Sequence, residues 1–159
     1  MLKIANTDLS KIGYYYAGSG QADVYRPTNI GFGVTYVLPV ILALLKAETG
    51  SIVVLENPEC HLHPKGQRMI GELIARCVSS GVQIFLETHS DHVLNGIRIA
   101  AKKELINHED VALFFISRPI DSCDKQSIIQ QPKILKNGKL DFWPDDFFDE
   151  WEKALDDIL

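Results

Sequence analysis

Apolar residues are concentrated in three short runs, at residues 51–56, 82–87 and 111–117. Each run is rich in β-branched and aromatic side chains, which favour the extended backbone of a strand. A nearly continuous apolar run is typical of a parallel strand whose sheet is covered by helices on both faces. The first run ends before Pro58, because proline has no amide hydrogen to donate to a sheet ladder. The pattern therefore predicts three short buried strands.

Helical periodicity occupies the segments before and between these runs. A helix over 64–80 is predicted by proline at its first position and by apolar residues spaced three and four apart. These residues are Met69, Ile70, Leu73, Ile74, Cys77 and Val78. A second helix is predicted over 90–103, with Ser90 as its N-cap. An earlier segment that ends near Lys46 is apolar nearly all round, which predicts a buried helix. The alternation predicts an α/β fold, with a mainly parallel sheet flanked by helices.

The pattern changes after residue 118. Residues 127–135 alternate weakly, Asn137-Gly138 is typical of a hairpin turn, and residues 139–142 are expected to form the return strand. A helix over 145–159, capped by Asp145, is predicted to present an apolar face to the chain's own sheet or to a partner. That face consists of Phe147, Phe148, Trp151, Leu155 and Ile158. We expect two units: a main α/β unit over 1–118 and a small α+β extension over 119–159.

Charge is distributed unevenly along the chain. The net charge is −5, but residues 141–159 hold eight acids and one base, which leaves +2 for residues 1–140. A strongly basic nucleic-acid surface is therefore not indicated. No apolar stretch is long enough to span a membrane, and no signal peptide is recognisable. Cys60, Cys77 and Cys123 have no disulfide-framework spacing, which favours reduced thiols and a cytoplasmic location.

Polar residues that could bind a ligand or take part in catalysis follow the first two strands. Glu56, Asn57 and Glu59 follow the first, and His89 follows the second. The carboxyl ends of neighbouring parallel strands meet at one edge, where open α/β sheets bind ligands. An apolar strand ending in acids has the form of a Walker B segment, in which Glu56 would hold Mg²⁺. Glu59 can serve as a general base, whereas Asn57 cannot take a proton and can only orient water.

A glycine-rich turn opens the first predicted helix. Backbone N–H groups at a helix N-terminus can cradle a phosphate, and Gly31 and Gly33 would allow its close approach. Thr35 would add a hydroxyl group. The simpler interpretation is a plain turn before a buried helix.

Three segments together resemble the ABC-type ATPases of the SMC/RecF-like and OLD-like families: NIGFGVTY (29–36), LENPECHLHP (55–64) and ETHSD (87–91). The resemblance covers about residues 25–118, and the region after it resembles a domain of unknown function, DUF3696. The resemblance to the ATPases implies binding of ATP and Mg²⁺, with His89 as the switch histidine at the γ-phosphate. It also implies a nucleotide-bound dimer, in which Gly31, Gly33 and Thr35 face the P-loop of the other protomer. The family usually has Asp-Glu where this chain has Glu56-Asn57.

The P-loop motif G-x-x-x-x-G-K-[ST] does not occur in the sequence. Gly18-Ser19-Gly20 lacks the Lys-Ser/Thr that would follow it. We therefore expect a C-terminal half that is inactive alone and that needs a P-loop-bearing N-terminal half or a homologous protomer. Contact with nucleic acid is expected only through the full-length assembly, and a role in DNA repair or phage defence rests on family analogy.

Two other interpretations remain open. The chain could be a non-catalytic interaction module that uses its acidic, aromatic tail. It could also be a zinc hydrolase built on His61, His63, His89 and Asp91, with Cys60 or His92 as a further ligand.

Overall fold

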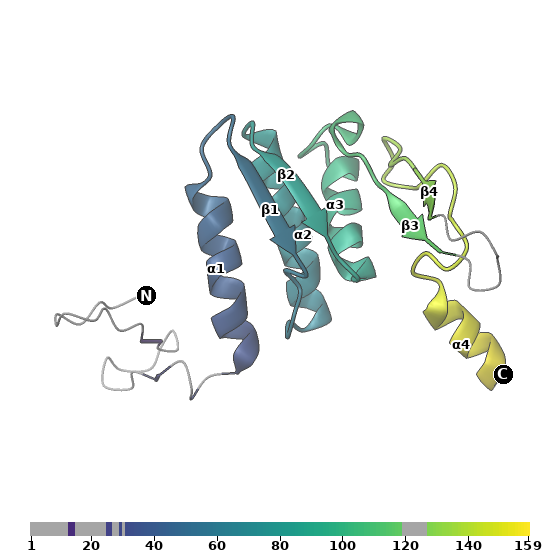
Figure 1. Ribbon diagram of the computed structural model, residues 1–159, viewed down its shortest axis with the longest axis horizontal. Helices are drawn as coiled ribbons and strands as arrows, with labels where there is room; N and C mark the ends of the chain where they lie inside the picture. The colour runs from purple at the N-terminus through teal and green to yellow at the C-terminus, as the bar shows by residue number, and fades with distance from the viewer. Residues whose placement is uncertain (1–12, 15–24, 27–28, 30, 119–126) are drawn as a thin grey trace.

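The computed structural model describes residues 13–14, 25–26, 29, 31–118 and 127–159 (Figure 1). Its elements are α1 (Phe32–Lys46), β1 (Ile52–Glu56), α2 (Pro64–Ser79), β2 (Gln83–Glu87), α3 (Asp91–Lys102), the 3-10 turn η2 (His108–Asp110), β3 (Phe115–Ser117), β4 (Ile128–Gln130) and α4 (Glu150–Ile158). The predicted α/β class is confirmed. Most of the N-terminal segment lies outside the described residues, but Tyr14 and Tyr25 form an antiparallel bridge. No helix in the described ranges is both long and apolar enough to cross a membrane.

The sheet at the centre is formed by β1 and β2. The two strands are parallel and in register from Ile52 opposite Gln83 to Glu56 opposite Glu87, and α2 connects them behind the sheet in Figure 1. This parallel pair and the helix between them were predicted. Buried side chains of α1, β1, α2 and the residue before β2 form one core cluster: Leu44, Leu55, Ile70, Ile74, Cys77 and Val82.

Helices α2 and α3 cross at two glycines. A Cβ atom on Gly71 would collide with the carbonyl oxygen of Val93, and one on Gly96 would collide with that of Arg68. The two backbones are therefore in direct contact, which only glycine allows. Behind this crossing lies a second core cluster, which joins α3 to the segments after it: Ala75, Val93, Ile97, Ala100, Ala101, Ile106 and Ile134.

The prediction of a third strand over residues 111–117 was wrong in the length of the strand and in the direction of its pairing. Within residues 111–117 only Phe115–Ser117 is a strand, and it pairs antiparallel with β4, not parallel as expected. Val111 and Leu113, in the preceding extended segment, pack against the core cluster that includes α3. Their burial against a helix takes the place of the expected parallel pairing.

None of the described elements covers one face of the β1–β2 sheet. Val53, Leu55, Ile84 and Leu86 pack toward the helices, but alternate residues point the other way. On that side Ile52, Val54 and Phe85 are 62%, 73% and 55% exposed. The expectation of a sheet covered on both faces was therefore wrong for the described residues.

Helix α1 is also less buried than predicted. Leu44 is its one buried residue, whereas Phe32, Val34, Tyr36, Leu42 and Leu45 are exposed. Among the described elements the helix packs against β1 and α2, so the rest of its apolar surface faces outward.

The C-terminal region contains the predicted turn. Gly138 has a φ of 77°, and Ile134 and Leu140 form an antiparallel bridge on either side of the turn. Arg98 of α3 donates from Nε to the carbonyl oxygen of Gly138 at 2.8 Å. Burial lowers the pKa of this guanidinium below its usual value. The hairpin is thereby joined to α3.

The final helix begins at Glu150, not at Asp145 as predicted. Asp146 and Phe148 have φ values of 63° and 57°, which interrupt any helix across 145–149. Phe147 is buried, and its ring lies 5.2 Å from that of Phe115 and 5.5 Å from that of Trp143. Burial of this ring in an aromatic cluster explains the turn.

Helix α4 does not dock on the chain's own sheet, which was the first of the two predicted sites for its apolar face. Its apolar side chains Trp151, Leu155 and Ile158 are 73%, 38% and 78% exposed, and the helix has no buried residue. The apolar face predicted for one helix is thus divided between the buried Phe147 and an exposed helix.

Candidate functional site

The turn after β1 has an unusual backbone. Asn57 and His61 have φ values of 47° and 63°, in the left-handed region. The N–H of Asn57 donates to the carbonyl oxygen of Glu87 at 3.1 Å, so the ladder between the strands continues one residue beyond Glu56. His63 caps α2 by accepting from the N–H of Lys65 at Nδ1. The turn is therefore fixed to the sheet at one end and to α2 at the other.

The turn after β2 is short and closed by hydroxyl groups. Ser90 is buried and accepts from the N–H of Val93 at 3.1 Å, which makes it the N-cap of α3, as predicted. The N–H of Ser90 donates to the hydroxyl of Thr88 at 3.1 Å. His89, between these two residues, has a side chain that is 85% exposed.

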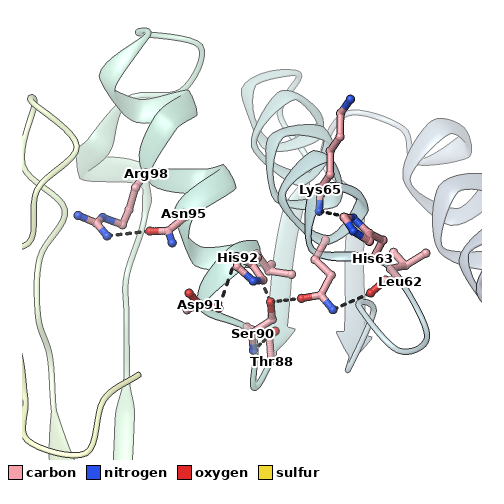
Figure 2. Close-up of polar contacts among 11 residues, drawn as sticks. Leu62, His63, Lys65, Thr88, Ser90, Asp91, His92, Asn95 and Arg98 are labelled. Atoms are coloured by element: carbon pink, nitrogen blue, oxygen red, sulfur yellow. Dashed lines mark hydrogen bonds and ion pairs between the residues drawn. The ribbon is translucent and has the colours of Figure 1, made fainter. Parts of the chain in front are cut away.

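Two side chains join the two turns. Glu59 is 8% exposed, and its Oε1 accepts from the backbone N–H of His89 at 3.0 Å. Gln67 of α2 donates to the carbonyl oxygen of Leu62 at 2.9 Å and accepts from the hydroxyl of Ser90 at 2.7 Å. Figure 2 shows this second link, which runs from Leu62 to Ser90 between α2 and the start of α3. Gln67 was not predicted as a site residue, because its contact with Ser90 depends on how α2 is rotated about its axis.

The second oxygen of Glu59 differs from the first. Oε2 is buried and has no hydrogen-bond partner among the described residues. A buried carboxylate oxygen without a partner is uncommon and calls for an explanation. It leaves one acceptor of this side chain available to a further group.

Two carboxylates lie side by side at the carboxyl edge of the sheet. Glu56 and Glu87 are partners in the parallel register, and both are exposed on its uncovered face. Glu87 Oε1 lies 3.2 Å from Nε2 of His89. Adjacent carboxylates repel each other, and a cation relieves that repulsion. Glu87 was missed as a site residue, although it ends its apolar strand just as Glu56 ends the first.

The glycine-rich start of α1 lies against the turn after β1. Gly31 is the N-cap of α1 and has open space around it. A Cβ on Gly33 would collide with the carbonyl oxygen of His61, and the rings of Tyr36 and His61 are 4.9 Å apart. The close approach that requires glycine at position 33 is therefore to the protein's own backbone. The Thr35 hydroxyl is buried and has no hydrogen-bond partner in the described part of the chain.

The donor groups at this edge fit magnesium better than zinc. Within the described ranges, no three His, Cys, Asp or Glu side chains are grouped so as to hold a metal ion. His63 is engaged as a helix cap, and His61 contacts the Tyr36 ring. Mg²⁺, in contrast, is commonly held by one or two carboxylates together with substrate phosphates. Glu56 and Glu87 supply oxygen donors of that kind.

The parallel strand–helix–strand unit with acids and a histidine at its carboxyl edge is an arrangement of ABC-type ATPase domains. Residues 3–95 match the family model described as "AAA domain, putative AbiEii toxin, Type IV TA system", which covers more than half of the sequence. The chain belongs to this family. Residues 106–158 match a second model, "Protein of unknown function (DUF3696)". The predicted kinship with AAA, ABC-type ATPases that carry a DUF3696 region is confirmed.

A solved structure supports the fold. It comes from work on the structural biochemistry of ATP-driven dimerization and DNA-stimulated activation of SMC ATPases. The similarity has a TM-score of 0.59 at 14% sequence identity and covers 99% of this chain and 80% of that one. At this identity the likeness concerns the fold. No functionally curated protein matches the sequence significantly.

Proposed function

We propose that this chain contributes the signature, Walker B and switch-histidine elements of an ATP-hydrolysing site. A P-loop-bearing N-terminal half, or a homologous protomer, supplies the phosphate-binding loop that the sequence lacks. Family membership and fold support an ATPase-like function. The observation that carries the proposal is the link between the two strand-end turns, in which Glu59 accepts from the N–H of His89. It keeps Glu56 and His89 at one edge of the sheet.

Each side chain at this edge has a proposed role. Glu56, with Glu87 beside it, holds Mg²⁺, which neutralises phosphate charge when it is bound. His89 contacts the γ-phosphate; its imidazole is exposed and lies against Glu87. Glu59 takes the proton from the attacking water at Oε2, the oxygen without a partner. Asn57 orients that water.

The remaining proposed contacts belong to an assembly. Gly31, Gly33 and Thr35 face the P-loop of a second protomer, so the nucleotide-bound form is a dimer. The SMC ATPases of the similar structure were studied for ATP-driven dimerization and DNA-stimulated activation, which supports this analogy. Contact with nucleic acid occurs only through the full-length assembly. That assembly acts in the cytoplasm, in DNA repair or phage defence. We retain the division into units at 1–118 and 119–159.

A second candidate function is protein interaction through the tail. Helix α4 exposes Trp151, Leu155 and Ile158, and the segment around it is strongly acidic. Such a surface suits a partner with an apolar groove and basic rim.

Reconstitution tests the ATPase proposal. The purified chain is mixed with the P-loop-bearing N-terminal half of a full-length family member, and phosphate release is measured with Mg²⁺ and ATP. His89→Ala should lower kcat about 10²-fold, the scale of losing a group engaged in proton transfer or charge stabilisation. Glu56→Ala should raise the Mg²⁺ concentration required for half-maximal rate.

His92→Ala is the matched control. This histidine lies on the first turn of α3, where its Nδ1 is 3.6 Å from Asp91, and it has no proposed role. The rate of phosphate release with the His92→Ala variant should equal that with the wild type. A mixture whose rate is unaffected by His89→Ala would contradict the proposed site.

A further inference from the structure

A cavity lies between the first turn of α3 and the first turn of α4. Its volume is about 540 Å³, and it is lined by Asp91, His92, Phe148, Glu150 and Trp151. The two residues from α3 follow Ser90 in Figure 2, whereas α4 lies at the C-terminal end of the chain in Figure 1. None of the five lining residues has a role in the proposed ATPase site.

Two of the lining residues are carboxylates. Asp91 lies in the first turn of α3 and Glu150 in the first turn of α4, where the free N–H groups of a helix favour negative charge. Among the described residues, no Lys or Arg contributes to the lining. Lys153, the base of α4, is engaged in ion pairs outside the cavity. The cavity therefore attracts positive charge.

Two aromatic rings complete this environment. The ring of Phe148 lies 4.6 Å from that of the buried Phe147, so packing fixes its position. Phe148 also has a φ of 57°, a backbone conformation that is uncommon for a bulky residue and that occurs often at binding sites. Trp151 is 73% exposed. The faces of such rings attract cations.

The combination of acids and rings disfavours other classes of ligand. An anion would be repelled by Asp91 and Glu150. A metal ion needs a closer group of donors, and within the described ranges no three His, Cys, Asp or Glu side chains are grouped so as to hold one. An organic cation suits both features, because its charge pairs with the carboxylates while its apolar stem packs on the rings.

We propose that this cavity binds an organic cation, a guanidinium or ammonium group carried on an apolar stem. The charged group lies between the carboxylates of Asp91 and Glu150 and over the ring of Trp151. The stem contacts Phe148. This inference goes beyond the proposed ATPase site and does not depend on it.

Two sources share this chemistry: a free amine, and the arginine or lysine side chain of a polypeptide. Trp151, Leu155 and Ile158 are spaced four and three residues apart, so they lie on one face of α4, and all three are exposed. This apolar face continues from the cavity. It suits the residues that flank a basic side chain in a polypeptide.

Nuclear magnetic resonance of the chain labelled with ¹⁵N measures binding directly. The chain has two tryptophans, Trp143 and Trp151, so its spectrum contains two indole N–H signals, which a Trp151→Phe variant assigns. Titration with N-acetylargininamide should shift the Trp151 signal to saturation and the Trp143 signal much less. The neutral isostere N-acetylcitrullinamide should bind at least about 10-fold more weakly, because it lacks the charge.

Two glutamates of α4 provide a matched pair of variants. Glu150→Gln and Glu152→Gln each remove one charge from the same helix, but Glu150 lines the cavity and Glu152 does not. Glu150→Gln should raise the Kd for N-acetylargininamide about 5-fold, whereas Glu152→Gln should leave it within about twofold of wild type. Asp91→Asn, on the other helix, should match Glu150→Gln. Circular dichroism checks that all variants are folded.

A peptide in which one arginine is flanked by two leucines distinguishes the two sources. Tighter binding of the peptide than of the amide, lost in Leu155→Ser, supports the cation site and assigns it to a polypeptide. Equal affinity for both probes supports the site and assigns it to a free amine. No saturable shift of the Trp151 signal, equal Kd values for the arginine and citrulline compounds, or equal losses in Glu150→Gln and Glu152→Gln would overturn the inference.

Discussion

At the scale of single residues, Glu59 has the most informative environment. It is an almost fully buried carboxylate. One oxygen accepts from the N–H of His89, and the other has no partner within the described ranges. The first oxygen gives it a positioning role, because it fixes the backbone of the histidine. The second gives it the proposed role of base. The two roles make different demands on the side chain.

Two substitutions distinguish these roles. Glu59→Gln retains an oxygen that accepts from His89 N–H but cannot take a proton, so kcat of the reconstituted ATPase should fall about 10²-fold. Because the link survives, the melting temperature should change little. Glu59→Leu removes the link as well and should also lower the melting temperature, since it leaves the N–H of His89 without its acceptor. An unchanged rate in Glu59→Gln would restrict Glu59 to positioning.

At the scale of elements, α2 and α3 at the centre are tightly joined, whereas α4 at the C-terminal end is loosely attached. Gly71 and Gly96 bring α2 and α3 into backbone contact, and the links through Glu59 and Gln67 span the turns that precede these helices. Helix α4 has no such attachment. Phe147, just before it, is the residue that anchors the tail to Phe115 and Trp143.

Alanine substitutions should reveal this contrast. Phe147→Ala removes a buried ring and should cost about 3–5 kcal/mol of unfolding free energy. Trp151→Ala removes a ring that is 73% exposed, so its effect should stay within about 0.5 kcal/mol. Urea denaturation of both variants measures the difference. Equal large losses would show that α4 is docked on the chain after all.

At the scale of the whole molecule, exposed apolar side chains lie beside acidic charge on two of the described surfaces. One is the uncovered face of the β1–β2 sheet, with Glu56 and Glu87 at its edge, and the other is the tail around α4. Both are expected of a chain that completes a larger assembly. The covered side of the sheet holds the core.

The chain alone should therefore not hydrolyse ATP. The P-loop supplies most contacts to the phosphates, and its motif is absent from the sequence. Purified protein with millimolar ATP and Mg²⁺ should show phosphate release at the background rate. Turnover by the chain alone that His89→Ala abolishes would contradict the need for a second segment.

Much of the fold could be predicted because it depends on local pattern. Strands 52–56 and 83–87, the helix from Pro64 and the Ser90 cap all follow from apolar spacing and capping chemistry. Glu87 was within reach of the same reasoning, since it ends a strand as Glu56 does. Gln67 was not, because its partner Ser90 lies 23 residues away in sequence.

The sequence by itself determined the family, the parallel strand–helix–strand order and the set of polar residues at the strand ends, because periodicity, caps and motif residues act over a few positions. Tertiary structure decided which surfaces are covered. Packing of Val111 and Leu113 replaced a third parallel strand, burial of Phe147 moved the start of α4, and one face of the sheet stayed open. Apolar pattern shows that a side chain favours burial, but only the arrangement of all elements decides whether anything is there to bury it.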